Sequence, residues 1–209
     1  MTSFISFNEI HPFIRYTQLT KLMYQETSIY SKAYDYRLFY IYGGKGSIWI
    51  EDSEYVASKG SFFMWKPGTK YSLRPYRSNF LEFIGFNFDF THKNCDKDYP
   101  VPPEKEENFK IDNIIEIINF TDIDAFDNPV ILNDMQMLET QLLEIKNEYI
   151  SHKKFFSQRI SGSFLMVLST VARTLFSINT VQKGSENIID SIIEYIHKNY
   201  NQDINNNEI

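Results

Sequence analysis

The stretch FFMWKPGTKYS, residues 62–72, contains two apolar runs separated by Lys66, Pro67 and Gly68. Proline restricts φ and glycine reaches positive φ, so a Pro-Gly pair between apolar runs is typical of a tight turn. The stretch therefore predicts a strand, a turn and a second strand that begins near Tyr71.

The sequence on both sides continues this pattern. From about Leu22 to Phe90, runs of β-branched and aromatic residues alternate with turn signals at intervals of roughly 8–12 residues, which is typical of a β-sandwich or barrel. The segment Gly43-Gly44-Lys45-Gly46 is expected to form a hairpin, because no helix start follows it as in a phosphate-binding loop.

The last β run, NFLEFIGFNFDF at residues 79–90, has one strongly apolar face. Side chains alternate along a strand, so every second residue shares a face. The apolar face contains Phe80, Glu82, Ile84, Phe86, Phe88 and Phe90. This face is expected to pack in a core, and residues 91–110, charged and with three prolines, are expected to form a connection.

The pattern changes toward the C-terminus. Residues 111–132 are ambiguous between a short helix and strands, although NPVIL looks extended. From Asn133 the apolar spacing becomes helical, and Asn133 or Asp134 is expected to cap the first helix. A second helix is expected over about 152–179 and a third from near Ser185, and the chain is expected to stop as a further segment begins.

Composition restricts the function. The net charge of −6 and the lack of a basic run argue against nucleic-acid binding by this chain alone. One cysteine, Cys95, excludes an intramolecular disulfide and fits a reducing compartment. The sequence shows no secretory signal and no evident membrane span, so we expect a soluble, cytoplasmic protein.

Three segments together resemble the N-terminal half of AraC/XylS-type transcription regulators: YDYRLFYIYGGKGSIWIEDSEYVASKGSFFMWKPGTKYSL at 34–73, FLEFIGFNFDF at 80–90 and NIIDSIIEYIHKNYNQDINNNEI at 187–209. The resemblance implies a mainly β plus α fold, with a cupin-like (jelly-roll) barrel followed by a helical dimerisation segment. It divides the chain into an N-terminal arm and barrel at 1–110, a linker and helical segment at 111–184, and the truncated start of a helix-turn-helix domain at 185–209.

The resemblance also addresses metal binding. Metal cupins bind their ion with an HxH pair, a glutamate and a histidine that follows the Pro-Gly turn. The corresponding positions here are Tyr30 and Lys32 for the HxH pair, Arg37 for the glutamate and Tyr71 for the last histidine. None of these side chains is a usual ligand of a divalent metal, and the guanidinium of Arg37 repels a cation. We therefore expect no metal and no other cofactor. The sequence also lacks GxSxG, HExxH and a plausible Cys–His pair, so we expect no enzyme activity.

The sequence supports a ligand-binding role better than metal binding or catalysis. If Arg37 and Tyr71 occupy interior positions, they place a guanidinium and a hydroxyl among aromatic walls, and Tyr40, Tyr42, Trp49 or Trp65 could stack on a ligand. Alternation lets only one of each adjacent pair point inward. The alternatives are a structural salt bridge for Arg37 and a core or interface role for the tryptophans.

Two further candidates are more open. Glu82 is either a polar anchor in the pocket or a solvated residue at the sheet edge. The segment up to about Tyr24, with Arg15 and Tyr16, is either an arm that closes over the barrel, as the resemblance implies, or an ordinary first strand.

The first helix could form an antiparallel seam across a dimer, as the resemblance implies, or pack on its own barrel. Its apolar positions are Met135, Leu138, Leu142, Ile145 and Tyr149.

These observations predict the effector-sensing and dimerisation domain of an AraC-type regulator. The expected partners are a second copy of the chain and a small effector (a sugar, an organic anion or an apolar ligand), with DNA bound only through a C-terminal domain beyond this sequence. The alternatives are a metal-independent cupin enzyme and a free-standing small-ligand-binding module.

Overall fold

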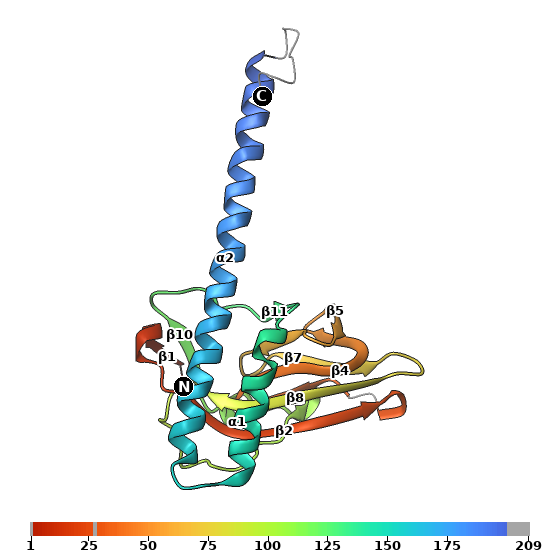
Figure 1. The fold of residues 1–209 in the computed structure, drawn as a ribbon, viewed down its shortest axis with the longest axis vertical. Coiled ribbons are helices and arrows are strands. Elements are labelled where there is room, and N and C mark those ends of the chain that lie inside the picture. Colours follow the sequence, from red (N-terminus) through yellow and green to blue (C-terminus); the bar gives the residue numbers. More distant parts are fainter. Residues whose placement is uncertain (1, 27–28, 200–209) are drawn as a thin grey trace. The chain divides into compact units, whose positions relative to one another are not determined.

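The computed structural model describes residues 2–26 and 29–199, with side chains described up to residue 178 and at residue 180. The chain divides into two compact units, Met1–Leu168 and Ser169–Ile209. The first unit contains the β-sheets, helix α1 and the beginning of helix α2 (Figure 1). The domain boundaries near 110 and 184 that the sequence indicated stay a prediction.

Most of the first unit is a curled, antiparallel sheet. Nine strands build it: β2 (Phe13–Met23), β3 (Ser31–Lys32), β4 (Tyr36–Ile50), β5 (Ser53–Ser58), β6 (Phe62–Trp65), β7 (Lys70–Pro75), β8 (Phe80–Asp89), β9 (Glu104–Lys105) and β11 (Val130–Leu132). A separate parallel pair joins β1 (Thr2–Ile5) to β10 (Ile117–Phe120). Short 3₁₀ turns lie at Phe7–Glu9, Tyr24–Glu26, Glu106–Asn108, Ile111–Asn113 and Gln136–Leu138.

Strand β4 connects the two halves of the curled sheet. Its first part pairs with β8 and β6, and its second part pairs with β5 and β7. Residues 43–46 lie inside this strand, so the predicted hairpin there is wrong. The glycines instead allow an irregularity between Ile41 and Gly43 and a close approach, since Gly44 has a φ of +80° and a Cβ there would lie 1.9 Å from the Phe80 carbonyl oxygen.

The turn predicted from residues 62–72 is confirmed. Strand β6 ends at Trp65, β7 begins at Lys70, and Gly68 between them has a φ of +84°. The segment NPVIL is extended as predicted, because β11 pairs antiparallel with β6.

Strand β8 is covered on both faces. On the face predicted to be core, Phe86 and Phe88 contact the ring of Phe164 on α2, with centroids 5.3 and 4.9 Å apart. On the other face, Leu81 and Phe83 belong to an apolar cluster inside the curled sheet. A half-barrel with helices on its outer face is the mixed β and α, cupin-like fold that the sequence predicted.

Residues 13–23 form strand β2, which pairs along β8 as an ordinary member of the sheet. Of the two interpretations of the N-terminal segment, the first-strand one describes these residues. The residues before β2 pair with β10 through β1. Just beyond β10, the Ser6 hydroxyl donates to the Asp122 carboxylate at 2.6 Å.

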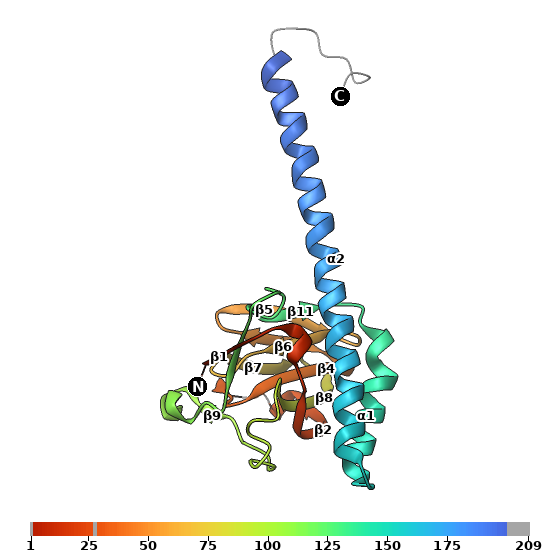
Figure 2. The same cartoon turned by 90° about the vertical axis from the view of Figure 1, so that its left-hand side faces the viewer.

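Helix α1 spans Glu139–Ser151 and α2 spans Phe156–Asn199. Neither Asn133 nor Asp134 caps α1: Asp134 has a left-handed φ of +59°, and α1 follows the 3₁₀ turn at Gln136–Leu138. Figures 1 and 2 show α1 beside the beginning of α2, where the Gln141 side chain donates to the Ser163 carbonyl at 3.0 Å.

The predicted dimer seam is largely buried within the single chain. Met135, Leu138, Leu142 and Ile145 are at most 2% exposed because α1 packs on β2 and β8, and the Tyr149 hydroxyl donates to the Arg15 carbonyl at 2.9 Å. Met135, Leu138, Leu142 and Ile145 therefore pack within their own unit, which is the alternative that the sequence left open, whereas Tyr149 is only partly buried.

Helix α2 runs without a break through residues 180–184, where the sequence had predicted the end of one helix and the start of another. Residues 200–209 of the predicted helix-turn-helix start lie outside the described residues. The segment Phe156–Ile178 is long and apolar enough to cross a membrane, contrary to the expectation from sequence, although core helices of soluble proteins share these properties.

Candidate functional site

A pocket of about 440 Å³ opens on the inner face of the sheet in the first unit. Such a volume is within the range that small-molecule sites occupy. Its lining comes from β2, β4, β8 and the connection after β8: Tyr16, Gln18, Thr20, Arg37, Phe39, Phe83, Gly85, Asn87, Pro100, Val101, Pro102 and Pro103. Arg37 is the only charged residue among them.

Cross-strand pairing builds the floor of the pocket. On β8, Asn87 lies between Tyr16 of β2 and Arg37 of β4, and Gly85 lies between Gln18 and Phe39. Side chains directly opposite one another on paired strands share a face, so these rows point into the same cavity.

Gly85 keeps the middle of the floor open. A Cβ at this position would lie 3.3 Å from the Phe39 ring and 3.5 Å from the Phe83 ring. A glycine in a strand interior often marks a close approach by a ligand or another backbone. Phe39 and Phe83 also belong to the interior apolar cluster, so the floor is supported from within the half-barrel.

Arg37 occupies one end of the pocket and is only 5% exposed. Its Nη2 lies 2.8 Å from Asp35 Oδ1 and donates to the Val101 carbonyl at 2.7 Å. Its Nε is buried without an acceptor. The guanidinium is therefore fixed in position and retains unused donor capacity.

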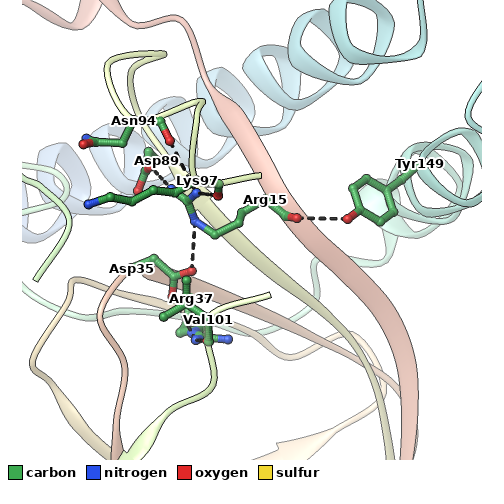
Figure 3. A network of polar contacts seen from close by, with 8 residues as sticks. All are labelled: Arg15, Asp35, Arg37, Asp89, Asn94, Lys97, Val101 and Tyr149. Carbon is green, nitrogen blue, oxygen red and sulfur yellow. Dashed lines mark hydrogen bonds and ion pairs between the residues drawn. The ribbon is translucent and has the colours of Figure 1, made fainter. Parts of the chain in front are cut away.

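Four buried charges form a network behind the pocket (Figure 3). Asp35 lies between the two arginines, with Arg15 Nε 3.5 Å from Oδ2, and Arg15 also pairs with Asp89. Arg15 is placed by a β-bulge, because the β2–β8 register shifts between Ile14 and Tyr16. The close pairing of opposite charges offsets the desolvation cost of burying them.

The low-dielectric surroundings change the proton affinity of both acids. Burial raises the pKa of Asp89 to about 7, against the opposing effect of Arg15 and reinforced by the charge of Asp35. Burial also raises the pKa of Asp35, although Arg37 and Arg15 both act to lower it. The network therefore contains carboxyl groups that hold protons more tightly than they do in water.

The structure brings together three of the predicted ligand residues. Arg37 lines the pocket and also forms the structural ion pair that was its alternative. Tyr71 and Trp65 lie in the adjoining apolar cluster, 5% and 2% exposed, with ring centroids 4.7 Å apart. They contact the Phe39 ring and so support the pocket wall without lining it.

The other three predicted ligand residues do not line the pocket. Tyr40 points to the opposite sheet face, where its hydroxyl donates to Glu139 Oε2 of α1 at 2.9 Å. Glu82 lies beyond the pocket, facing Lys21 of β2 and Gly43 of β4 in register. Arg15 is fully buried in the ion network.

Sequence reasoning missed the residues that shape the floor. Gly85 and Asn87 were assigned to the face of β8 opposite the core, and Gln18 and Thr20 were not singled out. Gly85 and Asn87 could have been noticed from the sequence, because a glycine and a polar residue among phenylalanines are unusual in a strand that is covered on both faces. Asp89 carried no local signal, since its partner Arg15 is remote in sequence. Asp35 lies two residues before its partner Arg37, but it was not singled out.

The cupin metal positions contain no ligand set in this structure. Lys32 pairs with Glu106 at 3.2 Å, and Arg37 and Tyr71 lie as described above. Among the residues whose side chains the structure describes, no three His, Cys, Asp or Glu side chains gather as a metal site.

No family model matches the chain. No curated protein matches it. Solved structures that match include a cupin protein from Bacteroides fragilis, with 12% identity, a TM-score of 0.32 and coverage of 45% of this chain and 68% of that one.

Two structures of ToxT from Vibrio cholerae also match: an apo variant (14% identity, TM-score 0.47) and the wild type bound to an unsaturated fatty acid (15% identity, TM-score 0.46). They cover 76% and 77% of this chain, which spans 56% and 55% of theirs. With scores this low, the fold above rests on strand pairing and the function is argued from the site.

Proposed function

We propose that this chain is the effector-sensing and dimerisation part of an AraC-type transcription regulator, and that its pocket binds a small molecule with an apolar body and a hydrogen-bond-accepting end. The fixed guanidinium of Arg37, which belongs to the only charged residue in the pocket lining, carries the proposal.

The composition of the lining favours binding over catalysis. The lining residues offer aromatic rings, prolines, two amides and a guanidinium, and they include no carboxylate, imidazole or thiol. Proton transfer and nucleophilic attack depend on such groups in most enzymes. We therefore propose that the protein binds its ligand without transforming it.

In this proposal the protein acts as a cytoplasmic homodimer. The ligand binds one of two dimer arrangements more tightly and shifts the population toward it, which moves the DNA-binding domains that lie beyond this sequence. The dimer contact is formed by surfaces other than the buried face of α1.

A thermal-shift screen of sugars, organic anions and fatty acids tests the proposal, followed by calorimetry of each hit on wild type, Arg37→Lys and Arg77→Lys. Lysine keeps the charge but lacks the planar fork, so Arg37→Lys is expected to weaken binding by about ten-fold or more. Arg77 is exposed and lies outside this pocket, so its variant is the matched control. Stabilisation by none of the compounds, or equal affinity in all three proteins, would contradict the proposal.

A further inference from the structure

Residues 94–103, here called the strap, form part of the connection between β8 and β9. They contain no helix or strand, and their last four residues, 100–103, line the pocket. Long connections of this kind within a compact domain commonly have a functional role.

Two buried arginines hold the strap through its backbone. Arg15 donates to the carbonyls of Asn94 (3.5 Å) and Lys97, and Arg37 donates to the carbonyl of Val101 (2.7 Å). Beyond a local bond from Cys95 N to the His92 carbonyl, these are the hydrogen bonds that join the strap to the rest of the described chain. The strap is thus held at both ends by one ion network.

The same guanidinium serves both the strap and the pocket. Arg37 Nη2 is bonded to Val101 while Arg37 lines the cavity that the strap covers. Asp35 holds the guanidinium from behind, so the side chain cannot follow the strap when the strap moves. An acceptor group that reaches Nη2 from inside the pocket would compete with the Val101 carbonyl for this donor.

We propose that the strap is a gate over the pocket, that Arg15 and Arg37 latch it through its carbonyls, and that a bound acceptor group unlatches it by taking Arg37 from Val101. The latch stands on the hydrogen bonds from Arg15 and Arg37 to the strap, whereas its release by a ligand rests on the proposed function.

The latch is also connected to helix α1. The Tyr149 hydroxyl donates to the Arg15 carbonyl at 2.9 Å, at the bulge that aims Arg15 toward the strap (Figure 3). A change at Arg37 can reach α1 through Asp35, Arg15 and this bond. The same network therefore makes hydrogen bonds both to the strap and to α1.

Hydrogen–deuterium exchange of the strap tests the latch without any ligand. In Arg37→Lys, which keeps the buried charge, we expect strap amides to exchange roughly ten-fold faster, as loss of a charge-assisted hydrogen bond predicts, with β8 unchanged. Cys95 is the only cysteine, is exposed and lies in the strap, so an environment-sensitive fluorophore on it provides a second readout.

The control is Arg77→Lys, which should leave strap exchange and the fluorophore unchanged. If Arg37→Lys fails to fold, the double variant Asp35→Asn/Arg37→Gln removes one charge of each sign and must show the same loosening. Strap exchange that equals wild type in a folded Arg37 variant overturns the latch. If strap exchange increases in the variant but no compound in the ligand screen binds, the latch is supported and the proposed function is rejected.

Discussion

At the level of single residues, strand alternation decides which side chains reach the pocket. Arg37 and Phe39 on β4 have the same parity and line it, whereas Tyr40 has the other parity and faces α1. On β8 the same rule separates Gly85 and Asn87 from Glu82. With Arg37 assigned to the pocket, alternation alone excludes Tyr40.

A side chain at position 85 should close the pocket. We expect Gly85→Val to reduce the affinity for a hit from the screen by at least about ten-fold, because the new methyl groups would lie among the rings of Phe39 and Phe83. Calorimetry checks this, and wild-type affinity in the variant would show that the ligand does not cross Gly85.

Gly162→Ala is the matched control for a glycine change. Gly162 lies in α2 with open space around its Cβ position, so alanine should leave ligand affinity unchanged and increase the free energy of unfolding by about 0.5–1 kcal/mol. Urea denaturation measures this gain, and a loss of stability would show that a neighbour crowds the position.

Asp89 should make stability depend on pH. Its pKa is raised from 3.8 to about 7 by burial, so its stabilising contribution is complete below about pH 4 and is lost as pH increases toward 7. Relative to wild type, Asp89→Asn should therefore be more stable at pH 8 than at pH 4.5, by roughly 1–4 kcal/mol between the two. Urea denaturation of both proteins at each pH checks this, and a pH-independent difference would contradict it.

At the level of elements, local sequence patterns located the strands correctly, but they did not show which glycine clusters form turns. The turn at 66–69 follows from proline and glycine chemistry and forms as expected. The glycines at 43–46 also favour a turn but lie within β4, because pairing with both β8 and β7 outweighs the turn preference. Tertiary pairing therefore decided the role of one glycine cluster and not of the other.

Helix α1 should contribute to folding rather than to dimer formation. Leu142→Ala is expected to lower the free energy of unfolding by about 2–5 kcal/mol because Leu142 is fully buried against the sheet. Met137→Ala, at a side chain 64% exposed, should change it by less than about 0.5 kcal/mol. Urea denaturation at several protein concentrations separates the two roles, since a seam residue would show a concentration-dependent cost.

At the level of the whole chain, net charge limits the possible partners. With a net charge of −6, the 209-residue chain should show no measurable affinity for random duplex DNA at physiological salt, because it cannot replace the counterions of phosphate. Fluorescence anisotropy with a labelled duplex checks this. Tight, salt-sensitive binding would show that this chain itself contacts DNA.

Arg37 became a candidate through the family resemblance. The strand-rich character of residues 22–90, the Pro-Gly turn and the apolar face of β8 could be read from the sequence, because alternation and turn chemistry are local. The pocket floor, the strap and the four-charge network could not. They depend on which strands pair, on the bulge at Arg15 that reverses the alternation of β2, and on contacts such as Arg15–Asp89 between residues 74 positions apart. Such registers are set by packing over the whole unit, and no local pattern carries that information.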